Sequence, residues 1–251
     1  MPNRRIAIVT GTSSGIGEEL ARQLLQRGWD VIGIARREPA IDSSGYTHCS
    51  LDLADVAQLT PRLERQVRPR LRDGGVTRLA LVNNAADVAL LGQVDQLEPG
   101  GMLQAYAINT VAPVLLMGWM LRTASSGIPV RIVNVSSGAG VEPIPGLGAY
   151  GCTKAALRLA GMVLGAELEM RAAGGAPRDV TVWSYEPGVV ATPMQDAVRS
   201  STTETVPIVQ VFKDLHAHGQ LRPADLPATE IVSYLEADGH TRFSEQRFLL
   251  S

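Results

Sequence analysis

The sequence predicts a doubly wound α/β fold, in which a mostly parallel sheet carries helices on both faces, within a single domain spanning residues 1–251. Strand-like apolar runs alternate with helix-length segments, and the clearest strands lie at 4–10, 30–35, 76–83, 130–136 and 180–185. Several of these runs are apolar at almost every position, which indicates strands buried on both faces, as in a parallel sheet. No repeat, linker or low-complexity tract divides the chain.

Turn and capping residues mark where the helices should begin. The expected starts lie near Gly15, Asp55, Pro99, Tyr150 and Pro223. The stretch 192–223 mixes a Ser/Thr-rich run with an apolar run. We interpret it as a lid over the substrate, with an ordinary surface excursion as the alternative.

The composition is that of a globular protein, with 45% hydrophobic and 19% charged residues. A net charge of −2 gives no general attraction to nucleic acid or anionic lipid, so neither partner is expected. The one basic row falls on a single helix face and is interpreted as solvated; its members are Arg62, Arg65, Arg68 and Arg72.

The two cysteines, Cys49 and Cys152, suggest neither a disulfide framework nor a zinc site, so no metal is expected. The N-terminal residues run into a strand with no long hydrophobic segment or small-residue cleavage site. A cytoplasmic protein is the expectation.

A glycine-rich turn, TGTSSGIG at 10–17, follows the first strand and opens a helix. Its glycines at 11, 15 and 17 permit close backbone approach, and the helix start presents free N–H groups and partial positive charge. This strand-turn-helix setting predicts a dinucleotide pyrophosphate site more strongly than a bare glycine-rich turn would.

The spacing Thr-Gly-x-x-x-Gly-x-Gly resembles the fingerprint of the short-chain dehydrogenase/reductase family, and the resemblance extends along most of the chain with its Rossmann fold. Asp52 corresponds to that family's adenine-contacting acid, and NNAA at 83–86 to its Asn-Asn-Ala-Gly turn, where Ala86 replaces a glycine. The resemblance implies cofactor contacts from Gly11, Ser13, Ser14, Gly15, Ile16, Gly17, Arg36, Arg37, Asp52, Leu53, Asn84, Ala85, Tyr150, Lys154, Pro187, Gly188, Val190 and Thr192.

The cofactor preference is predicted from the end of the second strand, which runs into Arg36 and Arg37 with no carboxylate. An acid there would accept from the ribose 2′-hydroxyl of NAD(H), whereas arginine can pair with a 2′-phosphate. We therefore expect NADP(H).

Tyr150 and Lys154 are four positions apart, which places both side chains on one helix face. A lysine ammonium about 4 Å from the phenol would contribute about 4 kcal/mol toward lowering the Tyr150 pKa at an effective dielectric near 20. Ser137 lies just past a strand, at the carboxyl edge where ligands of open α/β sheets bind. Ser136 is the competing serine and should point to the opposite side.

By the resemblance, Ser137 would bind the substrate oxygen, Tyr150 would exchange the proton, and Lys154 would hold the nicotinamide ribose. Asn109 corresponds to the family's fourth catalytic residue, which holds a water near Lys154; a core or capping amide is its alternative.

The segment 184–192 matches the family's Pro-Gly-x-x-x-Thr segment beside the nicotinamide. The run YEPGVVATPMQ at 185–195 resembles the subgroup of sepiapterin and benzil reductases, where Pro-Gly is followed by Thr-x-Met-Gln. Glu186 stands at a position that is normally small or neutral, and could disfavour anionic substrates if it faces the pocket. Apolar residues suit a bulky neutral ketone or 1,2-diketone; the expected lining is Ala139, Val141, Ile144, Leu147, Val189 and Met194.

The predicted activity is thus NADP(H)-dependent hydride transfer between nicotinamide and a carbonyl or alcohol. A catalytically idle NADP(H)-binding sensor is the alternative, although such a protein would usually lack one of Ser137, Tyr150 and Lys154. The helix at 150–171 carries more apolar surface than one buried stripe needs, which a subunit interface would explain. Members of the resembled family commonly pair this helix and the one near 102–121 across a two-fold axis, so the resemblance implies a homodimer or homotetramer.

Overall fold

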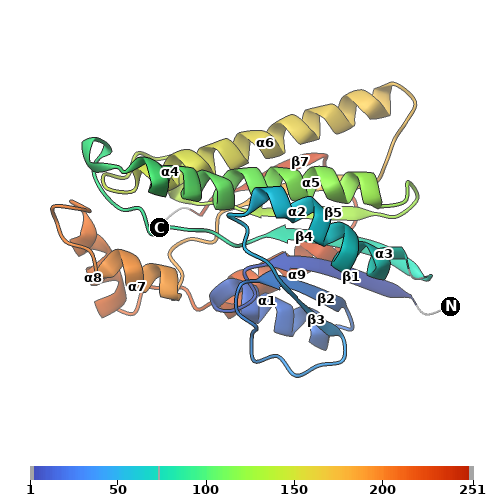
Figure 1. The fold of residues 1–251 in the computed structure, drawn as a ribbon, viewed down its shortest axis with the longest axis horizontal. Coiled ribbons are helices and arrows are strands. Elements are labelled where there is room, and N and C mark those ends of the chain that lie inside the picture. Colours follow the sequence, from blue (N-terminus) through green and yellow to red (C-terminus); the bar gives the residue numbers. More distant parts are fainter. Residues whose placement is uncertain (1–2, 73, 249–251) are drawn as a thin grey trace.

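The computed structural model describes residues 3–72 and 74–248, which form one α/β domain with a parallel sheet in the strand order β3-β2-β1-β4-β5-β6-β7 (Figure 1). The strands are β1 (Arg4–Thr10), β2 (Asp30–Ala35), β3 (Tyr46–Ser50), β4 (Val76–Asn83), β5 (Val130–Val135), β6 (Val180–Tyr185) and β7 (Phe243–Gln246). All neighbouring pairs are parallel. The predicted doubly wound parallel sheet is therefore confirmed.

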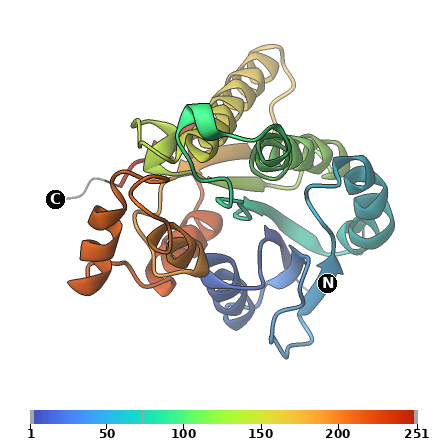
Figure 2. The same cartoon turned by 60° about the vertical axis from the view of Figure 1, so that its left-hand side comes forward.

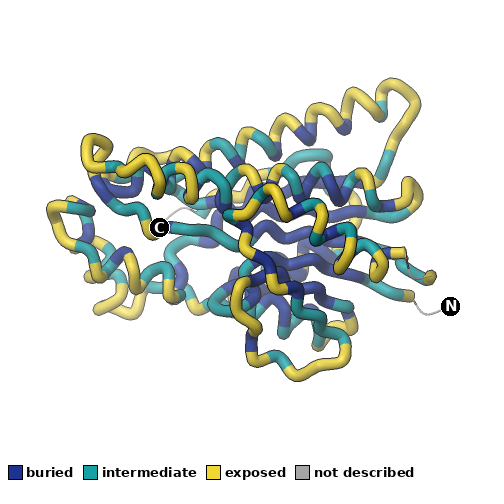
Figure 3. Tube along the Cα trace, in the orientation of Figure 1, coloured by how far each residue is buried: buried dark blue, intermediate teal, exposed yellow. Residues whose placement is uncertain are grey.

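Alternate residues of each strand enter two separate cores because side chains of a strand point to opposite faces. On β1, Ile6 and Ile8 pack toward α2 (Val56–Arg62), α5 (Ala112–Thr123) and α6 (Gly148–Ala173). Ala7 and Val9 pack toward α1 (Gly15–Gln26) and α9 (Asp225–Glu236). Figure 3 shows the strands buried in the middle of the molecule, with helices exposed outside.

Several predicted boundaries shift by a few residues. Asp55 is the N-cap of α2 and its side chain accepts from the Gln58 backbone N–H. α6 begins at Gly148, two residues before Tyr150, and α9 begins at Asp225, two residues after Pro223, so both lie near the predicted starts. The short edge strand β7 was not foreseen, because FSEQ carries no apolar pattern and one edge of it is free.

Two long helices contain a π-helical turn. The first joins α2 to α3 (Arg68–Arg72) through Leu63–Val67, and the second joins α4 (Pro99–Tyr106) to α5 through Ala107–Val111. By length and composition alone, 99–123 could cross a membrane, and 39% of its apolar window is buried. Ala112, Leu116 and Met120 belong to the core beside the sheet, as in a core helix of a globular fold.

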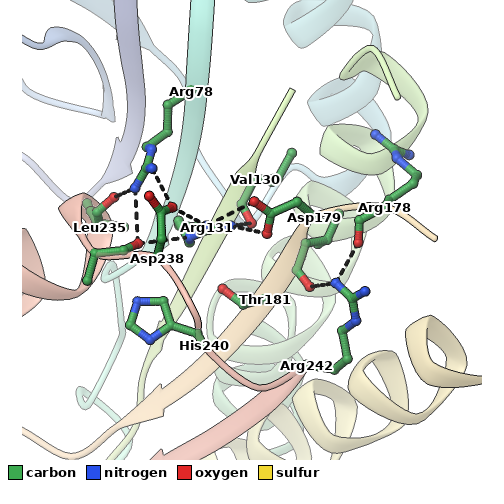
Figure 4. A network of polar contacts seen from close by, with 12 residues as sticks. Arg78, Val130, Arg131, Arg178, Asp179, Thr181, Leu235, Asp238, His240 and Arg242 are labelled. Atoms are coloured by element: carbon green, nitrogen blue, oxygen red, sulfur yellow. Dashed lines mark hydrogen bonds and ion pairs between the residues drawn. The ribbon is translucent and has the colours of Figure 1, made fainter. Parts of the chain in front are cut away.

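Ion pairs around Arg131 of β5 lie at the amino end of the sheet (Figure 4). The Arg131 side chain is only 1% exposed. Its guanidinium lies 2.7 Å from the Asp179 carboxylate and 2.9 Å from that of Asp238. Arg78 of β4 also pairs with Asp238, at 2.6 Å. These contacts connect two central strands to the segments that precede β6 and follow α9.

The stretch 192–223 folds into two short helices, α7 (Pro193–Arg199) and α8 (Val209–Ala217). They pack against each other beyond the carboxyl end of the sheet (Figures 1 and 2). The chain then returns to α9.

Candidate active site

A cleft of about 920 Å³ runs along the carboxyl ends of the strands, the edge at which the sequence analysis placed the functional residues. Its walls come from the glycine-rich turn, the ends of β2, β4, β5 and β6, the start of α6, and the α7–α8 segment. Parallel strands bring all of these loops to one edge, although they are far apart in the sequence.

The glycine-rich turn leaves room for a ligand against bare backbone. Gly11 and Gly15 have positive φ angles of 75° and 59°. A Cβ on Gly11 would lie 2.9 Å from Asn84 Nδ2, and a Cβ on Gly15 would lie 2.9 Å from Thr192 Cγ2. Ser14 is the N-cap of α1 without a side-chain capping bond, so the N–H groups of the first turn stay available. These features fit a pyrophosphate.

The structural role of Gly17 differs from that of Gly11 and Gly15. It lies outside the cleft lining, and a Cβ there would come within 2.3 Å of the Gly11 carbonyl oxygen. Its small size lets α1 pack closely on the turn. The cofactor contact expected from Gly17 stays a prediction.

The part of the cleft beside the ends of β2 and β3 is lined by Arg36, Arg37, Asp52 and Leu53. Both arginines follow β2 directly and are exposed. Asp52 is also exposed, and its carboxylate accepts from the Ala54 backbone N–H at 2.9 Å.

The floor of the cleft follows the end of β4. Asn84 Nδ2 donates to the Thr10 carbonyl oxygen at 2.9 Å, and the Thr10 hydroxyl accepts from the Ala85 backbone N–H. Ala86 lines the cleft. No described non-glycine residue has a positive φ, so an alanine at 86 meets no left-handed requirement.

Ser137, Tyr150 and Lys154 converge at the other end of the cleft. Ser137 follows β5 and is hydrogen-bonded to the Tyr150 phenol, while its Oγ accepts from the Ala139 N–H at 3.3 Å. Lys154 is 2% exposed, and its Nζ donates to the Val135 carbonyl oxygen at 2.8 Å. Ser136 continues the β5–β6 pairing, because its N–H donates to the Tyr185 carbonyl oxygen.

The pKa shifts of this pair differ from the sequence expectation. Burial raises the pKa of Tyr150 to about 12, with partial lowering from the Ser137 hydroxyl. Burial lowers the pKa of Lys154 to about 8. The Lys154 ammonium lies 5.6 Å from the centre of the Tyr150 ring, so desolvation outweighs the lowering that a cation 4 Å away would give. The chain alone therefore holds Tyr150 as a neutral phenol that can donate a proton.

Asn109 lies in the π-helical turn and outside the cleft lining. Its Oδ1 accepts from the Asp87 N–H at 2.7 Å, and its Nδ2 donates to the Asp87 carbonyl oxygen and the Thr153 hydroxyl. The Thr153 hydroxyl in turn donates to the Tyr150 carbonyl oxygen at 2.7 Å. These contacts make the side chain a buried amide that braces the turn of α6 that carries Tyr150. The catalytic role expected for Asn109 stays a prediction.

Thr153 was not singled out in the sequence analysis. A threonine between Tyr150 and Lys154 has no distinctive signal, because only the tertiary contact with Asn109 gives it a positioning role.

The loop after β6 is fixed by Arg222, which stands just after the α7–α8 segment. Its guanidinium donates to the Pro187 carbonyl oxygen at 2.6 Å and to Glu230 at 2.5 Å. Its backbone pairs with Val189 and Ala191. Pro187, Gly188, Val190 and Thr192 line the cleft in this arrangement.

Most of the residues that were expected to line the substrate pocket lie in the wall of the cleft. The cleft is lined by Ala139, Ile144, Leu147, Val189 and Met194, whereas Val141 is 39% exposed and lies outside the lining. The sequence analysis missed Phe212 and Leu215 of α8, and Arg247 and Phe248 after β7. The spacing of Ile208, Val211, Phe212 and Leu215 on one helix face was a signal for the first group. Nothing in the sequence marked the second.

Glu186 faces the cleft and is 9% exposed. Its carboxylate Oε1 lies 2.8 Å from the position that a Cβ on Gly138 would take. Burial raises the pKa of Glu186. The positive charge of Arg247 lowers this pKa, whereas the negative charges of Glu245 and Glu142 raise it.

Comparisons with known proteins agree with this geometry. The family described as short chain dehydrogenase matches residues 5–203. A benzil reductase ((S)-benzoin forming) of Bacillus cereus is 31% identical over 242 residues, covering 93% of this chain and 95% of the relative. A sepiapterin reductase of Meriones unguiculatus is 28% identical over 251 residues, covering 93% of this chain and 92% of the relative.

Solved structures share the fold. A short chain dehydrogenase/reductase from Saccharomyces cerevisiae has a TM-score of 0.80 at 23% identity, covering 96% of this chain and 95% of that chain. ElxO with NADP bound has a TM-score of 0.71 at 21% identity, covering 96% of each chain. With the family match over most of its length and a serine, tyrosine and lysine gathered beside a glycine-lined cleft, the chain belongs to the short chain dehydrogenase family of oxidoreductases.

Proposed function

We propose that this protein is an NADP(H)-dependent carbonyl reductase that acts on a bulky neutral ketone or 1,2-diketone. The observation that carries the proposal is the convergence of Ser137, Tyr150 and Lys154 at one end of a continuous cleft whose other end holds Arg36 and Arg37. Relatives named benzil reductase and sepiapterin reductase support the substrate class.

In this proposal the dinucleotide lies along the cleft. Free N–H groups at the start of α1, with Ser13 and Ser14, would hold the pyrophosphate. Arg36 and Arg37 would pair with the 2′-phosphate of NADP(H). The loop 187–192, fixed by Arg222, would hold the carboxamide. When bound, the nicotinamide supplies the hydride that the protein itself lacks.

The protein's own residues would then manage the oxygen and the proton. The Ser137 hydroxyl would donate to the substrate carbonyl oxygen and orient it beside Tyr150. The neutral Tyr150 phenol would donate its proton to that oxygen as negative charge develops on it. The Lys154 ammonium would stabilise the resulting phenolate, and the Asn109–Thr153 contact would keep Tyr150 in register.

The decisive experiment measures NADPH consumption by the purified protein with benzil, 1-phenyl-1,2-propanedione, sepiapterin and simple aldehydes. We expect consumption with the diketones, and faster turnover with them than with the small aldehydes. Binding of NADPH without consumption across a broad carbonyl panel would favour the idle sensor instead.

We further propose a homodimer or homotetramer. α6 exposes Leu159, Met162 and Val163, and α5 exposes Val114, so two helices on the same side of the sheet share an uncovered apolar surface. Light scattering should give a mass of two or four chains, and a monomeric mass would contradict this.

We also propose that 192–223 is the substrate lid and that the protein is cytoplasmic.

A further inference from the structure

Glu186 places a carboxylate in the wall of the cleft, next to the catalytic serine. The residue follows β6, and its backbone N–H donates to the Gln246 carbonyl oxygen at 3.0 Å, which fixes its position. Because Oε1 would lie 2.8 Å from a Cβ on Gly138, the carboxylate rests against the residue that adjoins Ser137. Neighbouring Cα atoms are about 3.8 Å apart, so this charge lies within about 8 Å of the Ser137 backbone.

The surroundings neutralise this carboxylate incompletely. Arg247 Nε lies 3.8 Å from Oε2, beyond hydrogen-bond distance, and the same guanidinium donates to Glu142 Oε1 at 3.0 Å. Glu142 and Glu245 add negative charge nearby, and the Phe248 backbone N–H contributes one hydrogen bond. Among the described residues no side-chain hydrogen bond to the Glu186 carboxylate is formed, so its oxygens retain acceptor capacity.

Resting on the proposed function, we infer that Glu186 determines substrate charge selectivity: it favours carbonyl compounds with an ammonium or hydroxyl donor next to the reacting carbonyl, and rejects those with a carboxylate there. Ser137 is hydrogen-bonded to the Tyr150 phenol, and Gly138 adjoins Ser137. A carbonyl oxygen bound by these two hydroxyls would therefore bring its adjacent substituent within reach of Gly138 and of the Glu186 carboxylate that rests against it. Opposite charges attract and like charges repel most strongly in a partly desolvated cleft.

The test compares carbonyl compounds that share a phenyl ketone and differ in the adjacent group. These are 1-phenyl-1,2-propanedione, 2-hydroxyacetophenone, 2-(dimethylamino)acetophenone as its cation, and phenylglyoxylate as an anion. The readout is the ratio of kcat/KM for the cation to kcat/KM for the anion, with NADPH. Glu186→Gln should lower kcat/KM for the cation about tenfold and raise kcat/KM for the anion about tenfold, so the ratio should fall about 100-fold. Glu186→Ala should also lose the preference for the hydroxyl compound over the diketone, because the acceptor is gone.

Glu245→Gln is the matched control. It removes the same charge close by, yet Glu245 pairs with Arg158 and lies outside the cleft lining, so the ratio should change less than about threefold. An unchanged ratio in Glu186→Gln, or an equal change in Glu245→Gln, would overturn the inference.

The outcome separates this inference from the proposed function. Failure of the wild-type protein to consume NADPH with any of the four carbonyls would count against the reductase, not against Glu186. In that case, calorimetry of benzylammonium and benzoate binding in the presence of NADP⁺ gives the same comparison without turnover. We expect tighter binding of the cation in the wild-type protein, and equal or reversed affinities would reject the role of Glu186.

Discussion

The two ends of the parallel sheet show opposite ways of handling charge. At the amino end, Arg131 is buried and paired with Asp179 and Asp238 at hydrogen-bond distance, so its charge is satisfied within the protein (Figure 4). At the carboxyl end, Lys154 is equally buried, but its Nζ meets a carbonyl oxygen rather than a carboxylate.

This difference separates stability from reactivity. A buried cation with carboxylate partners keeps its charge and holds segments together, whereas one without them has its pKa lowered by desolvation. The pKa of Lys154 falls to about 8, within reach of a functional proton equilibrium. Tyr150→Phe, Arg131→Met and the pH profile of reduction can break or sharpen that separation, and replacement of Arg36 and Arg37 tests the rest of the cleft.

The largest effect is expected from Tyr150→Phe, at the carboxyl end. Loss of the phenol removes the proposed proton donor, so kcat for carbonyl reduction should fall by roughly 10²–10⁴-fold. The NADPH dissociation constant, measured by fluorescence titration, should change less than about threefold, because the pyrophosphate contacts remain. Retention of more than a tenth of kcat would remove Tyr150 from the mechanism.

Arg131→Met tests the amino end. It removes the contacts to both carboxylates, and we expect a loss of about 2 kcal/mol in the free energy of unfolding. This is below the roughly 3–5 kcal/mol for a fully buried pair, because the Asp179 and Asp238 side chains are 52% and 71% exposed. Urea unfolding provides the measurement, with kcat/KM of the folded variant within twofold of wild type. Arg171→Met breaks an exposed pair with Glu167 as a control and should cost under about 1 kcal/mol. Equal losses in the two variants would refute the distinction.

The cofactor preference is tested by replacing Arg36 and Arg37 together with alanine. KM for NADPH should rise about tenfold, while KM for NADH should change less than twofold, since only NADPH carries the 2′-phosphate. Arg65 and Arg72, both exposed on the helix 56–72, form a matched double-alanine control with the same charge loss. A similar rise for both cofactors in the Arg36/Arg37 variant would disprove the assignment.

The pH dependence of reduction should reflect Lys154. Its lowered pKa of about 8 means that the ammonium loses its proton as the pH rises through that value. Since the proposed mechanism needs the ammonium, kcat/KM for reduction should decline by several-fold per pH unit on the alkaline side. Rate profiles between about pH 6 and 10 provide the check, and no decline before the alkaline limit of folding would contradict this role.

Much of the site was predictable because its motifs lie within single segments. The glycine-rich turn, the spacing of Tyr150 and Lys154, and Arg36 and Arg37 after a strand each depend on local geometry. The order of strands and motifs was enough to bring these residues to one edge of a parallel sheet, and the cleft there includes them.

Other features depended on contacts between distant segments. The side chain of Asn109 forms hydrogen bonds with Asp87 and Thr153. Arg222 fixes a loop that precedes it by more than thirty residues. β7 carries no apolar pattern, and its pairing with β6 is what brings Arg247 and Phe248 to the cleft.

The sequence by itself therefore determined the fold class and the glycine turn, because periodicity and spacing specify what happens within one element and at its ends. The candidate catalytic residues came from the resemblance of its motifs to the short-chain dehydrogenase/reductase family. The tertiary structure alone decided the environment of each group: that Glu186 faces the cleft, that Tyr150 is a neutral phenol, and that the Lys154 ammonium meets a backbone carbonyl oxygen. Burial and the charges of neighbours set these properties, and both arise from residues that meet only when the chain has folded.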